Sequence, residues 1–170
     1  MGKFIITMWA RLLALTSASY VLWATLWAFC YRKFLWDFVG GDLGSKGLIP
    51  SPKVELFIKE IVDFPVVQII NLLLSLFTLS IEYPLHSSLL RLKLFRSLPV
   101  RVALHFVDFG FAMLLYQTID GGVFYLVTSL VYFVAWRKGE TIGLDGEGRL
   151  AETIKHEDKN RPGAARVQRI

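Results

Sequence analysis

Residues 12–31 read LLALTSASYVLWATLWAFCY and hold no charged side chain. Lys3 and Arg11 precede this run, and Arg32 and Lys33 follow it. A helix of about 20 residues is about 30 Å long, which is the thickness of the hydrocarbon core of a bilayer. The run is too long for the apolar core of a signal peptide, and no small residues mark a cleavage site at its end. We therefore predict a membrane-spanning helix at 12–31 that stays in the mature protein.

The composition of the whole chain also favours a membrane protein. Of 170 residues, 54% are hydrophobic, 14% aromatic and 19% charged, with a mean hydropathy of +0.49. Soluble domains carry about 25% charged residues, and disordered chains carry few aromatic ones. The single cysteine, Cys30, has no partner for an intrachain disulfide, and the Cys and His spacing of a zinc site is missing. Because the basic residues flank apolar runs, the expected partner is membrane lipid and not nucleic acid.

Three further apolar runs complete a predicted four-helix transmembrane bundle, so the expected fold class is all-α and polytopic. The predicted spans lie at about 12–31, 64–83, 99–119 and 121–137. A tight turn at Asp120, Gly121 and Gly122 is expected to join the last two spans as a hairpin. Residues 1–140 then form the membrane domain.

The distribution of basic residues predicts the orientation of this bundle. With four spans, 14 Lys and Arg residues lie on one side of the membrane and five on the other. The positive-inside rule places the more basic side, with both termini, in the cytoplasm, and makes loop 40–63 non-cytoplasmic. Residues 141–170 alternate charges and are expected to be a flexible cytoplasmic tail. Residues 89–96 mix leucines with basic residues, as in a helix that lies in the lipid headgroup layer.

The predicted span 99–119 carries three ionisable residues on one helix face. Arg101, His105 and Asp108 are spaced by four and then three residues, and the last two lie roughly 9–14 Å inside the helix start. Either they are buried polar contacts within the bundle or with a partner, or they serve as a proton relay or a haem site. We place contacts above chemistry, because polar residues inside helix bundles commonly hold the helices together. A haem held by this chain alone is not expected, because it usually takes two imidazoles and only His105 lies at membrane depth.

A polar seam follows the predicted span 64–83 at steps of three and four residues. Its members are Gln68, Asn71, Ser75, Thr78 and Glu82. Lipid cannot satisfy amide and carboxylate groups, so the seam must face other helices, either inside the bundle or in a partner. Alanines four residues apart in the first span allow helices to approach closely. These pairs are Ala14 with Ala18 and Ala24 with Ala28.

The sequence holds no phosphate-binding loop, dinucleotide-binding glycine motif or nucleophile triad, so no catalytic, cofactor-binding or metal-binding residue is predicted. Two blocks of residues carry a resemblance instead. The first block is Met8, Trp9, Ala10, Ala14, Leu15, Ser17, Arg32, Trp36 and Phe38. The second block is Glu82, Tyr83, Pro84, Val100, Arg101, Leu104, His105, Gly121, Ser129, Tyr132, Ala135, Gly139 and Glu140. Together they resemble the light chain of the cytochrome b-type NADPH oxidase, and Trp36 to Gly41 is similar to small fungal membrane proteins.

This resemblance implies a non-catalytic subunit that binds and stabilises a superoxide-generating oxidase as a heterodimer. Haem, FAD and NADPH would belong to the catalytic partner, and the endoplasmic reticulum or plasma membrane would be the location. Arg101, His105 and Ser129 match the pattern of the family and are expected to support assembly. Residues 40–64 depart from that pattern as an insertion.

Two further expectations follow from the sequence. The chain has no P-x-x-P tail, so recruitment of an SH3-bearing organiser is not expected. The alternative function is that of a freestanding transporter or lipid-binding protein, in which Arg101, His105 and Asp108 line a polar path.

Overall fold

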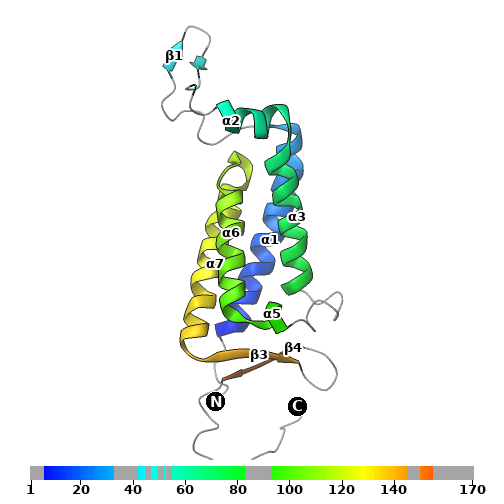
Figure 1. The fold of residues 1–170 in the computed structure, drawn as a ribbon, viewed down its shortest axis with the longest axis vertical. Helices are drawn as coiled ribbons and strands as arrows, with labels where there is room; N and C mark the ends of the chain where they lie inside the picture. The colour runs from blue at the N-terminus through cyan, green and yellow to red at the C-terminus, as the bar shows by residue number, and fades with distance from the viewer. Residues whose placement is uncertain are drawn as a thin grey trace, which may run out of the picture.

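Four long helices stand side by side in the computed structural model of this chain (Figure 1). The structure describes residues 6–32, 42–44, 47–49, 52, 55–82, 93–144 and 150–154. The long helices are α1 (Ile6–Cys30), α3 (Val66–Glu82), α6 (Leu98–Ala112) and α7 (Ile119–Arg137). They close a ring in which α1 contacts α3 and α7, and α6 contacts α3 and α7. The predicted all-α class is confirmed for this packed part of the chain.

Shorter elements lie at the two ends of the ring (Figure 1). One end carries the antiparallel hairpin of β1 (Asp42–Gly44) and β2 (Gly47–Ile49), then α2 (Glu55–Ile58) and a π-helical turn (Lys59–Asp63). The other end carries α5 (Lys93–Arg96) and the antiparallel hairpin of β3 (Glu140–Leu144) and β4 (Leu150–Ile154). A 3-10 turn, Tyr116–Thr118, leads into α7.

Helix α1 buries small residues and exposes large ones. The alanines predicted to allow close approach are all buried, as is Ala10. On its outer face Trp9, Trp23 and Trp27 are 53%, 62% and 50% exposed. Small buried residues let α1 lie close to α3 and α7, whereas a water-soluble helix would bury its large apolar side chains.

The start of α3 is set by Pro65. Proline disfavours the helical conformation in the residue before it, and Phe64 is extended with φ −115° and ψ 123°. Helix α3 therefore begins at Val66, slightly later than the predicted span 64–83, and ends at Glu82. Gln68 Nε2 donates a hydrogen bond to the carbonyl oxygen of Ile61 (2.8 Å), which ties the π-helical turn to α3.

The predicted turn at Asp120, Gly121 and Gly122 is wrong. These residues lie in the first turn of α7, and the helical path is interrupted earlier, between Ala112 and Ile119. Both glycines serve helix packing. A Cβ on Gly121 would lie 2.3 Å from Cγ2 of Val21 in α1, and a Cβ on Gly122 would lie 3.3 Å from the Cβ of Ala112. A glycine pair in a sequence does not reveal the neighbouring helix, so the packing role was not predicted.

Glu140, which follows α7, joins the end of that helix to the start of α1. Gly139 has φ 75°, a conformation that ends many helices, and Glu140 follows it. The Glu140 carboxylate accepts hydrogen bonds from the backbone N–H groups of Ile6 (3.0 Å) and Thr7 (2.8 Å) and from the Thr7 hydroxyl. The N–H groups of a first helical turn have no partner within the helix, so this carboxylate caps α1.

The end of the chain differs in part from the predicted flexible tail at 141–170. Glu140 pairs with Ile154 and Leu144 with Leu150 across the β3–β4 hairpin, and Ile142 of β3 is buried against α1, α6 and α7. Residues 145–149 and 155–170 of the predicted tail, parts of the predicted loop 40–63, and residues 89–92 lie outside the described residues.

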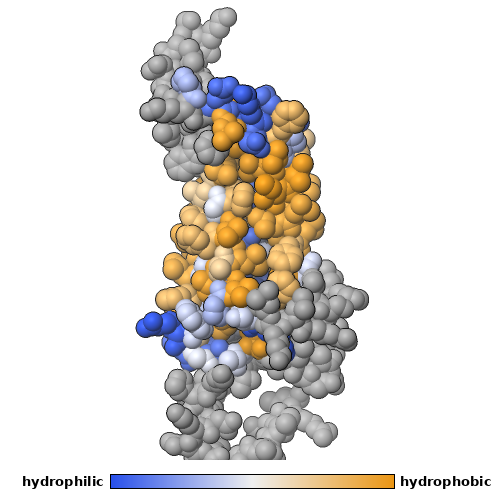
Figure 2. Space-filling model, viewed as in Figure 1, coloured by the Kyte–Doolittle hydropathy of each residue, from blue (hydrophilic) through white to orange (hydrophobic). Residues whose placement is uncertain are grey.

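Two of the helical segments are long and apolar enough to cross a membrane, Ile6–Cys30 and Tyr116–Arg137. Helices α3 and α6 have 17 and 15 residues and are about 26 and 23 Å long. Figure 2 shows an apolar surface over the middle of the helices and hydrophilic residues towards both ends.

Candidate functional site

A buried carboxylate at the end of α3 brings together polar side chains from the other long helices. Glu82 Oε2 accepts hydrogen bonds from Arg101 Nη1 (2.5 Å) and from the Tyr132 hydroxyl (2.8 Å). Glu82 Oε1 lies 3.3 Å from His105 Nε2. All these side chains are at most 1% exposed. We define the Glu82 network as Glu82, Arg101, His105, Asp108 and Tyr132.

Helix α1 reaches the network through Arg11. Its Nη2 donates to the carbonyl oxygen of Glu82 (3.0 Å), and its Nε lies 3.9 Å from Glu82 Oε2. The Arg11 side chain is 20% exposed, so this second guanidinium connects the buried carboxylate to the surface. The last residue of α3 is therefore held by both of its carboxylate oxygens and by its backbone.

Arg101 is the cation of the network. Besides Glu82, its Nη1 donates to the Tyr132 hydroxyl (3.1 Å), and its Nε donates to the carbonyl oxygen of Phe95 in α5 (3.0 Å). The guanidinium carbon lies 5.7 Å from the centroid of the Tyr132 ring. A buried charge is tolerated only when it is paired and hydrogen-bonded, and Glu82 supplies that pairing from a different helix.

His105 lies one turn further along α6, between two tyrosine rings. Its ring is 5.3 Å from Tyr132 at an interplanar angle of 6°, and 5.8 Å from Tyr125 at 21°. Its Nε2 faces Glu82, and its Nδ1 lies 3.4 Å from Asp108 Oδ2. Both ring nitrogens are thus directed at carboxylates of this chain.

Asp108 has weaker partners than Glu82. Its Oδ2 accepts a hydrogen bond from the Thr78 hydroxyl of the polar seam (2.9 Å). The contact with His105 Nδ1 is close enough for an ion pair but is not aligned as a hydrogen bond. Asp108 Oδ1 and Arg101 Nη2 are buried and have no hydrogen-bond partner among the described residues.

The remaining members of the polar seam and Ser129 also bond within the bundle. Asn71 Nδ2 donates to the carbonyl oxygen of Phe111 in α6 (3.1 Å), and the Ser75 hydroxyl donates to that of Asn71 (2.7 Å). Ser129 in α7 donates to the carbonyl oxygen of Val102 in α6 (3.0 Å). All five seam residues are buried, so the seam faces the other helices of this chain.

The sequence analysis placed neither Tyr132 nor Arg11 nor Glu140 among the candidate contacts. For Tyr132 a signal was present: buried polar residues of α7 recur at helical spacing. They are Tyr125, Thr128, Ser129 and Tyr132. The capping by Glu140 had no such signal, because its partners are more than 130 residues away in the sequence.

The arrangement acts as an ionic clamp between helices. Two carboxylates, the Arg101 guanidinium and the His105 imidazole are enclosed by α1, α3, α6 and α7, and the Arg11 guanidinium approaches Glu82 from the partly exposed side. Within the part of the chain that the structure describes, no three His, Cys, Asp or Glu side chains converge as a metal site would require. The geometry joins helices that are not adjacent in the sequence.

One protein-family model matches this chain. It is described as a domain of unknown function, DUF7727, and it matches residues 1–140. The matched region contains all four long helices and ends at Glu140, which caps α1. No curated protein and no solved structure matches the chain.

Proposed function

This chain belongs to the DUF7727 family, and we propose that it is a four-span integral membrane protein that serves as a non-catalytic subunit of a superoxide-generating NADPH oxidase. In this proposal the chain binds and stabilises the catalytic subunit as a heterodimer. Haem, FAD and NADPH are held by that partner.

The pattern of burial supports membrane insertion, because polar residues face the interior and large apolar residues face outward, the reverse of a water-soluble protein. Helix α3 turns its polar seam inward, while Ile69 and Leu73 on its other side are 46% and 61% exposed. Such an apolar surface is too extensive for a monomer in water. In lipid it is satisfied by acyl chains, and the small and polar residues mediate the contacts between helices.

Exposed aromatic residues support the placement of the bundle across the membrane. Trp9 and Trp27 of α1 are 18 residues apart in a continuous helix, or about 27 Å. Tyr116 and Trp136 at the ends of the other long segment are about 30 Å apart on the same basis. Trp and Tyr collect at the two edges of a hydrocarbon core about 30 Å thick.

The side-by-side arrangement of the four long helices supports four spans. Helices α3 and α6 lie alongside α1 and α7, so a membrane crossed by the longer pair also surrounds the shorter pair. The excess of Lys and Arg assigns the end with α5 and β3 to the cytoplasm, together with both termini. The endoplasmic reticulum or the plasma membrane is the proposed location.

The subunit role rests on one observation. Residues of the second resemblance block come together in the folded chain: Glu82, Arg101, His105 and Tyr132 belong to the Glu82 network, and Ser129 joins α7 to α6 one turn from Tyr132. The part of the sequence that resembles the oxidase light chain is therefore the part that holds α3, α6 and α7 together. Contacts between helices that this chain has in common with the light chain support a common arrangement of the helices.

In this proposal the partner binds the outer faces of the helices. The polar seam and the Glu82 network face inward, so they support assembly by positioning the helices and not by contacting the partner. Met8 and Trp9 also belong to the resemblance, and both are more than half exposed on α1. This surface is our candidate for the heterodimer contact.

Deletion of the gene tests the proposal. Superoxide output and the amount of mature catalytic oxidase are expected to fall, because binding stabilises only the assembled state. A chain that ends after residue 154 is expected to restore both. Trp9→Ala is expected to reduce co-purification of the haem-bearing subunit, and Trp23→Ala, which changes another tryptophan that is more than half exposed but lies outside the resemblance, is the matched control. Unchanged superoxide and oxidase levels in the deletion strain would rule out the proposal.

The second candidate is a freestanding membrane protein with a polar path. It is favoured by Asp108 Oδ1 and Arg101 Nη2, two buried atoms without a hydrogen-bond partner among the described residues, which a translocated solute or water could satisfy. Flux through vesicles that contain only this chain, abolished by Asp108→Asn, would support this function over the subunit role.

A further inference from the structure

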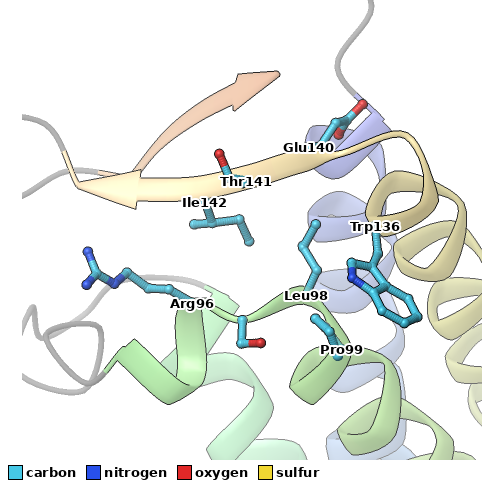
Figure 3. A pocket seen from close by; sticks show the side chains of 8 residues that line it. Arg96, Leu98, Pro99, Trp136, Glu140, Thr141 and Ile142 are labelled. Atoms are coloured by element: carbon cyan, nitrogen blue, oxygen red, sulfur yellow. The ribbon is translucent and has the colours of Figure 1, made fainter. Parts of the chain in front are cut away.

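A groove lies where α6, α7 and β3 meet, at the end of the bundle that carries Glu140 (Figure 3). Its volume is about 480 Å³, within the range of small-molecule sites. The lining residues are Arg96, Ser97, Leu98, Pro99, Trp136, Glu140, Thr141 and Ile142. The groove is separate from the Glu82 network and contains none of its members.

Among the described residues, the groove carries a positive charge that no acidic side chain pairs with. Arg96 is partly exposed and makes no hydrogen bond or ion pair with any described residue. Glu140 is the single acidic lining residue, and its carboxylate is occupied by the start of α1. Figure 3 shows the Glu140 side chain directed towards α1. The charge available to a ligand is therefore that of the Arg96 guanidinium.

The rest of the groove offers an apolar wall and a hydroxyl group. Trp136 is 46% exposed, and Pro99 beside it is exposed as well. The Ser97 side chain makes no capping hydrogen bond to α6, so its hydroxyl can donate to a ligand. Trp136 also belongs to the aromatic residues that mark the edge of the hydrocarbon core, so the groove lies at the level of lipid headgroups.

We propose that this groove binds the headgroup of an anionic phospholipid. The phosphate pairs with the Arg96 guanidinium at one end of the groove, and the first carbons of the acyl chains lie against Trp136 and Pro99 at the other end. Guanidinium groups suit phosphate oxygens because they present several donors in one plane. The inference rests on the membrane insertion proposed above, but not on the oxidase partner.

Native mass spectrometry of the full chain, purified alone in mild detergent, tests the site. The probes are phosphatidylserine, phosphatidylcholine and inorganic phosphate. The wild-type chain is expected to retain one phosphatidylserine in preference to phosphatidylcholine. Arg96→Gln is expected to weaken that binding about tenfold, the effect of losing one charge-assisted hydrogen bond. Arg137→Gln is the matched control, because Arg137 is exposed in the last turn of α7 and does not line the groove.

Three results would overturn the site. Equal loss of phosphatidylserine in Arg96→Gln and Arg137→Gln would indicate general attraction between the basic end and the anionic lipid. Displacement of the lipid by millimolar inorganic phosphate would indicate a site for free phosphate, without a contribution from the acyl chains. Equal retention of phosphatidylcholine and phosphatidylserine would show that the charge of the lipid does not contribute to binding.

A separate measurement distinguishes failure of the site from failure of the proposed function. Resistance of the chain to alkaline carbonate extraction reports membrane insertion alone. An inserted chain without the lipid preference refutes the groove and leaves the subunit role standing, whereas an extracted chain refutes both.

Discussion

At the scale of single residues, the polar core depends on Glu82 more than on the three ionisable residues that α6 contributes. Its carboxylate contacts Arg101, His105 and Tyr132, and each of them lies on a helix other than its own. Arg101 has one backbone carbonyl, that of Phe95, and the Tyr132 phenol as neutral partners, but Glu82 is the carboxylate that balances its charge. Asp108 receives one hydroxyl and faces one imidazole.

Glu82→Leu is therefore expected to lower the free energy of unfolding by about 3–5 kcal/mol, because it leaves the Arg101 charge buried without compensation. Thermal unfolding in detergent and protein abundance in cells measure the effect. The double variant with Arg101→Leu is expected to recover part of the loss, since an apolar pair of similar size avoids the buried charge. Glu55→Leu is the control, because the Glu55 carboxylate is 66% exposed and is expected to contribute little. Normal stability of Glu82→Leu would show that Arg101 is solvated.

Asp108→Leu is expected to have a smaller effect, about 1–3 kcal/mol, because it removes one accepted hydrogen bond and leaves the Thr78 hydroxyl buried without an acceptor. A double-mutant cycle with Thr78→Val measures the coupling between the two side chains. Additive effects of the two substitutions would contradict the contact.

At the scale of elements, the helices depend on small residues for their contacts. Gly121→Ala is expected to destabilise the bundle by about 1–3 kcal/mol, because the new Cβ would lie 2.3 Å from Cγ2 of Val21 and force α7 away from α1. Gly110→Ala is the matched control in a neighbouring helix, since no atom lies within 4 Å of its added Cβ. Gly110→Ala is expected to be neutral or stabilising, because alanine favours a helix over glycine. Equal thermal stability of the two variants would rule out the close approach.

Glu140→Ala is expected to destabilise the start of α1 by about 1–2 kcal/mol, the effect of losing a helix cap. Hydrogen exchange at the amides of Ile6 and Thr7 should accelerate, because both N–H groups lose their acceptor. Thr7→Val removes only the hydroxyl contact and should leave this exchange slow. Unchanged exchange in Glu140→Ala would contradict the cap.

At the scale of the whole molecule, the ring of helices places its two hydrophilic ends on opposite sides of the apolar surface (Figure 2). Glu55 lies in α2 at one end, and Lys138 follows α7 at the other. Both are exposed, so single cysteines at these positions can report the side of the membrane that each end faces.

In a Cys30→Ser background, Lys138→Cys is expected to react with an impermeant maleimide only from the cytoplasmic side, and Glu55→Cys only from the opposite side. The native Cys30 is exposed and must be removed so that each signal comes from one site. Labelling of both positions from the same side would contradict a bundle in which α1 and α7 cross the membrane.

The sequence alone determined the features that depend on near neighbours along the chain. Apolar runs, interrupted in α6 by three ionisable residues, predicted the long helices. Steps of three and four residues placed the seam and the ionisable residues of α6 on single faces, because a helix repeats every 3.6 residues. These patterns did not indicate which helix faces contact one another. The interpretation of Gly121 and Gly122 as a turn failed for that reason, since the nearby Val21 belongs to another helix.

Only the tertiary structure decided the partners. Arg101 and His105 pair with Glu82, and Glu140 reaches the start of α1 across more than 130 residues. The same sequence pattern is compatible with a side chain that faces lipid, its own bundle or another chain. Which of these it faces follows from the close approach that the small residues of α1 and α7 allow, and from the requirement that every buried charge have a partner.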